Sequence, residues 1–142
     1  MFEKRIVGID YGRKRIGLAR SDPLRMTAQP LETVTAESPK GLFQKLLAVL
    51  ATMEIELLII GLPKSLSGGG GAMAEEVTKF AENLQKEGYK VELVDERLSS
   101  KEVEKMMRMA GKSERDSRGK IDTVVAQLLL QTYLDRTGGS GQ

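Results

Sequence analysis

The segment Leu57–Gly61 (LLIIG) constrains the fold of this chain more than any other part of the sequence. Its uninterrupted apolar run is typical of a central strand that is covered on both faces of a sheet. Two segments with helical spacing flank it and predict what covers it. Their apolar positions are Phe43, Leu46, Leu47 and Leu50 within Gly41–Met53, and Met73, Val77, Phe80 and Leu84 before Gly88. This order predicts an α/β domain.

The other segments complete a mixed sheet. Arg5–Asp10 and Arg15–Arg20 read as the two strands of a hairpin, with the turn at Tyr11–Lys14. Further strands are expected at Gln29–Val34 and Lys90–Asp95, and further helices from Ser99 or Ser100 to about Gly111 and from about Arg118 to Asp135. The prediction is a single domain over residues 1–136, with a mixed five-stranded sheet flanked by helices, and a flexible C-terminal tail over 137–142.

The composition excludes several kinds of chemistry. The 142 residues include no cysteine and no histidine, so disulfides, thiolate sites and imidazole catalysis are absent. Any catalysis must therefore use carboxylates, hydroxyls, lysine or arginine. The absence of cysteine makes a reducing cytoplasm the natural compartment. The N-terminal apolar run is too short for a secretory signal or a membrane span, which predicts no membrane partner.

The net charge of +2 is too small to identify a partner, but its distribution is uneven. Residues 1–25 hold seven Lys and Arg against three acids, and residues 101–120 hold seven against four. The middle of the chain, 26–100, holds seven against eleven. Two basic segments brought together by the fold would attract phosphate, whereas ordinary solvated surface charge is the alternative explanation.

Three acidic positions stand where an α/β sheet gathers its functional groups. Asp10 ends the first strand, Asp95-Glu96 ends the last, and Asp122 lies in the first turn of the final helix. Carboxyl ends of strands converge on one crevice, and oxygen ligands there suit Mg²⁺ or Mn²⁺. Such a site can hydrolyse a phosphodiester. Taken singly, the acids could instead form an Asx turn, complement a helix dipole or pair with surface arginines.

Five segments together resemble the YqgF family. They are DYGRKRIGLA (Asp10–Ala19), IIGLP (Ile59–Pro63), MAEEVTKFAENL (Met73–Leu84), DERLSS (Asp95–Ser100) and KIDTVVAQLLLQTYLD (Lys120–Asp135). The resemblance runs in order from about residue 5 to residue 135. It implies a ribonuclease H-like fold, related to the RuvC resolvases, and a nuclease that matures the 5′ end of precursor 16S ribosomal RNA. Resolution of four-way DNA junctions is the older assignment for this family.

Carried onto this chain, the resemblance assigns catalysis and metal binding to Asp10, Glu96 and Asp122. Glu96 is favoured over Asp95 because neighbouring residues of a strand point to opposite faces of the sheet. Asp95 stays as an alternative ligand, because this alternation no longer holds if the strand ends before the two residues. A module of the same fold that binds RNA without cleaving it is a further alternative. A phosphotransferase would need two such domains, and this chain supplies one. A monomer and a homodimer are both compatible with the sequence.

Basic residues near these acids are candidates for holding the nucleic acid. They are Arg13, Lys14, Arg15, Arg97, Arg118 and Lys120. Backbone geometry or close packing best explains Gly8, Gly12 and Gly17. The Gly68–Gly71 run lacks the Gly-Lys-Ser/Thr ending of a nucleotide-binding P-loop, which leaves its role open.

Overall fold

A computed structural model describes residues 2–63, 71–96 and 114–138, with the backbone alone at 63, 96 and 114–122. The strands are β1 (Arg5–Tyr11), β2 (Arg15–Ser21), β3 (Ala28–Pro30), β4 (Val34–Thr35), β5 (Ile55–Pro63) and β6 (Val91–Glu96). The helices are α1 (Pro39–Leu50), α2 (Gly71–Lys86) and α4 (Glu114–Thr137). The helix predicted from Ser99 or Ser100 to Gly111 lies outside the described residues.

The strands form one mixed sheet in the order β3-β2-β1-β5-β6, and β4 pairs with β2 beside this path. β1 is antiparallel to β2 and parallel to β5, which is in turn parallel to β6. The predicted central strand is therefore β5, between β1 and β6. The α/β architecture and the mixed sheet are confirmed, but the described sheet has six strands rather than the five predicted, because the segment expected as one strand forms both β3 and β4.

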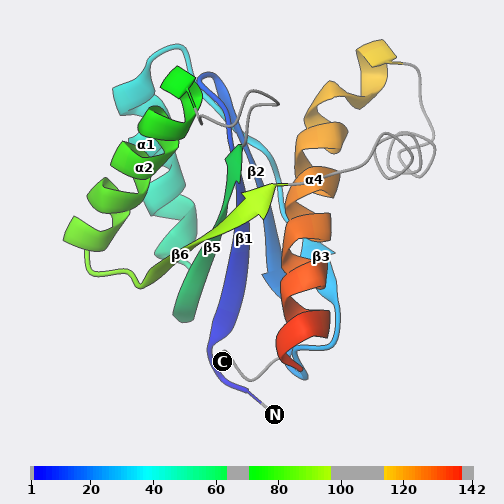
Figure 1. The fold of residues 1–142 in the computed structure, drawn as a ribbon. Coiled ribbons are helices and arrows are strands. Elements are labelled where there is room, and N and C mark those ends of the chain that lie inside the picture. The colour runs from blue at the N-terminus through cyan, green and yellow to red at the C-terminus, as the bar shows by residue number, and fades with distance from the viewer. Residues whose placement is uncertain (1, 64–70, 97–113, 139–142) are drawn as a thin grey trace.

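Helices cover both faces of this sheet (Figure 1). α1 and α2 pack on one face through buried residues that include Leu42, Leu46, Leu50, Val77 and Leu84. α4 packs on the other face through Ala126, Leu130, Tyr133 and Leu134. Because both faces are buried, β5 has no polar side chain from Leu57 to Leu62, as its sequence predicts.

Several boundaries differ from those predicted; for example, α1 ends at Leu50 rather than Met53, and β5 extends by two residues at each end. The expected strand Gln29–Val34 is two short strands, β3 and β4, separated at residues 31–33. Pro30 is the last residue of the first of them, and the Leu31 N–H beyond it still donates to the Leu18 carbonyl of β2 at 3.0 Å. Helix α1 begins at Pro39 rather than Gly41, because Ser38 caps it by accepting a hydrogen bond from the Gly41 N–H at 3.1 Å. Helix α4 begins at Glu114, four residues before the predicted start.

Helix α4 also closes the β3 edge of the sheet. The Gln131 side chain accepts a hydrogen bond from the Ala28 N–H at 2.9 Å and donates one to the Met26 carbonyl at 2.9 Å. Gln127 donates to the Ala28 carbonyl at 3.2 Å. These amides satisfy backbone groups that an edge strand would otherwise expose. The predicted tail begins where α4 ends: Gly138 has φ +65°, typical of a residue that terminates a helix, and 139–142 lie outside the described residues.

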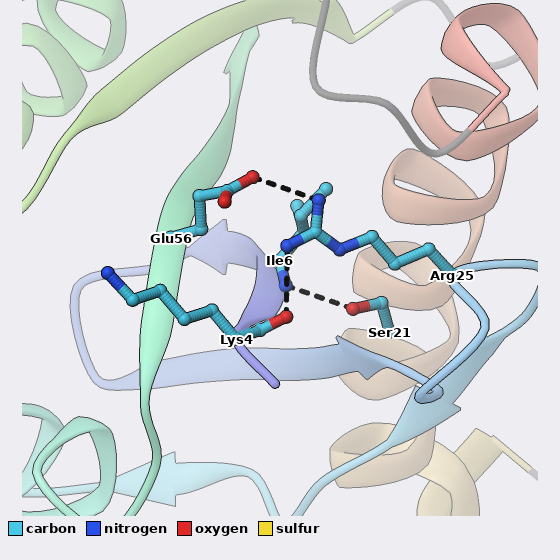
Figure 2. Close-up of polar contacts among 5 residues, drawn as sticks. All are labelled: Lys4, Ile6, Ser21, Arg25 and Glu56. Carbon is cyan, nitrogen blue, oxygen red and sulfur yellow. Dashed lines mark hydrogen bonds and ion pairs between the residues drawn. The ribbon is translucent and has the colours of Figure 1, made fainter. Parts of the chain in front are cut away.

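A buried arginine, Arg25, holds the amino-terminal end of β1. Arg25 is only 3% exposed and has a left-handed backbone with φ +54°. Its guanidinium donates to Glu56 Oε2 at 2.9 Å and to the Lys4 carbonyl at 3.0 Å, as Figure 2 shows, and lies 4.0 Å from the centre of the Phe2 ring. The hydrogen bond from Arg25 lowers the pKa of Glu56, and burial opposes it. This cluster ties the 22–27 loop to β1 and β5.

We expect Arg25→Ala to lower the free energy of unfolding at pH 7 by about 2 kcal/mol, because it removes two charged hydrogen bonds and a cation–π contact. The pKa of Glu56 is lower in the folded state, so its contribution is complete above the unfolded value of about 4.3 and is lost as pH falls through the folded value. Denaturant unfolding at pH 7 and pH 3 should therefore show a smaller acid loss in the variant than in the wild type. Leu24→Ala, at a neighbouring residue that is 59% exposed, is the control and should change little. Equal acid losses in wild type and Arg25→Ala would contradict the role of the ion pair.

No helix in the described ranges is both long and apolar enough to cross a membrane.

Candidate active site

Asp10 lies at the carboxyl end of β1, one residue before the strand ends, and is half-buried. It pairs with Gly17 of the antiparallel strand β2. Side chains alternate along a strand, so Asp10 shares a face with Gly8, which lies against α4. Ile9 packs on the other side, in the core beneath α1 and α2. Asp10 is therefore on the α4 face of the sheet.

The segment Asp95-Glu96 ends β6, which is parallel to β1 and separated from it by β5. The ends of the two strands therefore lie at the same edge of the sheet, with backbones about 10 Å apart, or two strand spacings. Asp95 is exposed and shares its face with Leu93, which packs on the α1 and α2 side. Val94 packs instead with α4. The side chain of Glu96 lies outside the described residues.

The backbone of α4 brings position 122 to the same edge. α4 runs antiparallel to β1: Ala126 and Leu130 lie against Gly8, and Leu134 packs with Ile6 near the start of the strand. From Gly8 to Asp10, β1 advances about 6.6 Å. From Ala126 back to Asp122, α4 covers about 6 Å. The backbone at Asp122 therefore lies beside the carboxyl end of β1. The side chain of Asp122 is not among the parts that the structure describes.

The contact between α4 and β1 depends on glycine at position 8. A Cβ there would lie 2.8 Å from the Ala126 carbonyl oxygen and 2.9 Å from Leu130 Cβ. At Gly12, in the hairpin turn, a Cβ would lie 2.5 Å from the Arg15 carbonyl oxygen. Both glycines serve close packing, as predicted from the sequence. Gly8 thereby sets the distance between Asp10 and the helix that carries Asp122.

The hairpin turn after Asp10 carries the predicted basic residues 13–15, all exposed. Arg13 forms an ion pair with Glu76 of α2, with its Nη2 2.9 Å from Oε1 and its Nε 3.1 Å from both carboxylate oxygens. This hydrogen bonding raises the pKa of Arg13. The Lys14 carbonyl accepts from the Ala36 N–H at 3.2 Å, and Arg15 pairs with Thr35 of β4. The turn is thus held from both sides beside Asp10.

The remaining predicted basic residues are placed only in part. Arg118 and Lys120 lie on the first turns of α4, before Asp122, where the backbone alone is described. Arg97 and the 64–70 part of the glycine-rich loop lie outside the described residues. Gly71, the last glycine of that run, is the first residue of α2 and has φ +66°.

Among the side chains that the structure describes, no group of three or more acids could hold a metal ion. The side chains of Glu96 and Asp122 are not among those described. The donors available at this edge are carboxylates, which fit the preference of Mg²⁺ and Mn²⁺ for oxygen ligands.

One feature beside Asp10 is not evident from the sequence. Tyr11, the next residue, packs against Phe80 of α2, with ring centres 4.6 Å apart and ring planes tilted by 43°. Burial raises the pKa of the Tyr11 hydroxyl, the Glu76 carboxylate raises it further, and the Arg13 cation opposes both. Phe80 follows the core spacing of its helix, so the sequence indicates its burial but not its partner, 69 residues away.

Solved structures with the same arrangement define the class of fold. The fowlpox virus resolvase in complex with Holliday junction DNA matches with a TM-score of 0.61 and 12% identity, over 94% of this chain and 98% of that one. RuvC of T. thermophilus, in complex with a Holliday junction substrate, matches with a TM-score of 0.54 and 20% identity, over 95% and 96%. The protein therefore has the ribonuclease H-like fold of these resolvases.

The sequence comparisons identify the family within that fold. Residues 4–136 match the model of the family described as "RuvX: Holliday junction resolvase". A protein of Endomicrobium trichonymphae is 44% identical over 133 residues, covering 92% of this chain and 95% of that protein. A protein of Chlorobaculum tepidum is 43% identical over 136 residues, covering 93% and 94%. Both are named "Putative pre-16S rRNA nuclease". The chain belongs to the RuvX family, also called YqgF, as the resemblance predicts.

Proposed function

We propose that this protein is a metal-dependent nuclease that processes the 5′ end of precursor 16S ribosomal RNA. The observation that carries the proposal is the convergence at one edge of the sheet. The carboxyl ends of β1 and β6 lie there, and α4 passes beside β1 at a distance that Gly8 sets. All three acidic positions belong to these segments. The names of the relatives support precursor ribosomal RNA as the substrate.

In this proposal Asp10, Glu96 and Asp122 hold the metal ion. Glu96 is favoured over Asp95 because it follows Val94 by two residues and so belongs to the strand positions that face α4, as does Asp10. Asp95 follows the opposite face. A Mg²⁺ or Mn²⁺ ion held there would supply activation of water and stabilisation of the leaving oxygen of a phosphodiester. The three carboxylates would hold the ion and compensate its charge.

The basic hairpin turn would hold phosphates next to the cleaved bond. We expect Arg13→Ala to weaken RNA binding and to reduce the slope of log K against log salt by about one, as for the loss of one phosphate contact.

The ion pair with Glu76 competes for the same guanidinium. Glu76→Gln should therefore strengthen RNA binding at low salt by about two- to fivefold, the range of an exposed ion pair. Glu82→Gln, at an exposed acid on the same helix, is the control and should not change the affinity. Weaker binding by Glu76→Gln would instead show that the ion pair positions Arg13 for RNA.

The substrate is tested by presenting the wild-type protein with two nucleic acids, each with Mg²⁺ and with Mn²⁺. One is a fragment that spans the precursor 16S 5′ end, and the other is a four-way DNA junction. We expect cleavage of the RNA at a defined position, with a loss of activity in EDTA. Cleavage of the junction alone would contradict the RNA proposal and favour a resolvase, which the family description and the structural relatives keep open.

The proposed substrates also differ in symmetry. A four-way junction is cut symmetrically by a two-fold dimer, whereas a ribosomal precursor end has no such symmetry and suits a monomer. Sedimentation of the protein alone and with RNA distinguishes the monomer from the homodimer.

Processing of a ribosomal precursor would place the protein in the cytoplasm.

A further inference from the structure

A cavity of about 390 Å³ lies between α1 and α2, at the end of β1 next to Asp10. Its volume is within the range of small-ligand sites, about 300–1,000 Å³. It lies on the face of the sheet opposite α4, so it is separate from the proposed metal site. Its lining includes the aromatic residues Tyr11, Phe43 and Phe80 and the charged residues Lys40, Glu76 and Lys79.

The walls of this cavity are aromatic. The ring centres of Tyr11 and Phe80 lie 4.6 Å apart with their planes tilted by 43°, and Phe43 meets Phe80 edge-on at 6.1 Å. Phe80 is buried, while Tyr11 and Phe43 are half-buried and therefore remain accessible in part. The whole chain has only six aromatic residues, and half of them meet here. A flat, unsaturated ligand would gain stacking contacts that an aliphatic pocket cannot offer.

The surroundings of the cavity favour an anionic ligand. Lys40 and Lys79 are exposed, and Glu76, the one carboxylate among the described lining residues, is already paired with Arg13. Lys40 lies in the first turn of α1, which has no acidic residue to offset the positive end of its helix dipole. An aromatic wall with cations beside it is complementary to a base and its phosphate.

We propose that this cavity binds one unpaired nucleotide of the RNA strand, with its base against Tyr11 and Phe43 and its phosphate near Lys40 and Lys79. This inference rests on the proposed function, because it takes the ligand to be part of the substrate strand. Asp10 and Tyr11 are consecutive and face opposite sides of the sheet. A strand that crosses this edge would place one nucleotide in the cavity while a neighbouring phosphate reaches the acids.

The test measures, in EDTA, the affinity of the protein for a labelled single-stranded RNA and for the same RNA annealed to its full complement. Loss of one stacked base costs about 1–3 kcal/mol, so Phe43→Leu should weaken single-strand binding about fivefold or more and leave the duplex unchanged. Lys79→Gln should weaken single-strand binding about two- to threefold. Lys86→Gln, seven residues further along α2 and outside the cavity lining, is the matched control and should not.

The inference would be overturned if both Phe43→Leu and Lys79→Gln bound single-stranded RNA as tightly as wild type. It would also be overturned if the variants lost as much affinity for the duplex as for the single strand. Lys79 is exposed, so its variant keeps the test valid if Phe43→Leu is unstable. Failure of the proposed function gives a different result, because the wild-type protein would then bind the precursor RNA without cleaving it. In that case the ratio of single-strand to duplex affinity, compared between wild type and variants, would still show whether the cavity binds an unpaired nucleotide. Wild-type cleavage together with unchanged binding would reject the cavity alone.

Discussion

Asp10→Asn should reduce metal-dependent RNA cleavage by about a thousandfold or more while RNA binding in EDTA is retained. The substitution keeps the shape of the side chain but removes the charge that would hold the metal ion. Stabilisation of the transition state by such an ion is worth several kcal/mol, and each 1.4 kcal/mol is a factor of ten in rate. Single-turnover cleavage at saturating RNA measures the effect without a contribution from binding.

Asp95→Asn is the matched control for this result. It makes the same chemical change at an exposed acid on a nearby strand end, on the face that Leu93 shares with α1 and α2. We expect its rate to stay within a few-fold of wild type. A larger loss in Asp95→Asn would assign the ligand to Asp95 rather than Glu96. If neither wild type nor Asp10→Asn cleaves but both bind RNA equally, the protein is an RNA-binding module without catalysis.

Gly8→Ala should both destabilise the protein and slow cleavage. The added Cβ would need the Ala126 carbonyl to retreat by about 0.6 Å, from 2.8 Å to the 3.4 Å at which ordinary contacts begin. Overpacking of this kind costs about 1–3 kcal/mol in free energy of unfolding. Because α4 carries Asp122, its displacement also disturbs the proposed metal site. Displacements of this order cost up to about a hundredfold in rate, so we expect a ten- to hundredfold loss.

Leu134→Ala separates the two effects. Leu134 is 2% exposed in the same contact between α4 and the sheet, and its truncation should cost about 2–5 kcal/mol by leaving a cavity. It does not push α4 away, so the rate per folded molecule, measured well below the unfolding midpoint, should stay near wild type. Equal loss of rate in both variants would mean that stability, and not the position of α4, governs activity.

The strands and helices were predictable wherever one local pattern dominates. The apolar run of β5 predicted a strand buried on both faces. The helical spacing of apolar residues within Gly41–Met53 (Phe43, Leu46, Leu47 and Leu50) and before Gly88 (Met73, Val77, Phe80 and Leu84) predicted the two helices that cover one of those faces. The predicted start of α1 was wrong because one residue overrides the pattern: Ser38 caps the helix, which begins two residues before Gly41. Capping is a local effect that competes with hydrophobic periodicity over a short stretch.

The site was predictable in its acidic positions but not in its surroundings. Asp10 lies one residue before the end of β1 and Glu96 ends the parallel strand β6, close to the expected positions, and their proposed role as ligands stays a prediction. The pairing of Arg13 with Glu76 joins residues 63 positions apart. The burial of Arg25 against Glu56 depends equally on contacts that no local pattern encodes. Such contacts follow from tertiary packing, which the sequence alone does not reveal.

The glutamines of α4 have a consequence for how copies of this protein meet. Extension of a sheet between two molecules needs free backbone donors and acceptors at an edge. At Ala28 both groups are already occupied by Gln127 and Gln131. A second copy could add a strand beside β3 only by displacing both side chains and loosening α4 from the sheet. Self-association at this edge would therefore disturb the helix that carries Asp122, so a catalytically competent oligomer must form elsewhere.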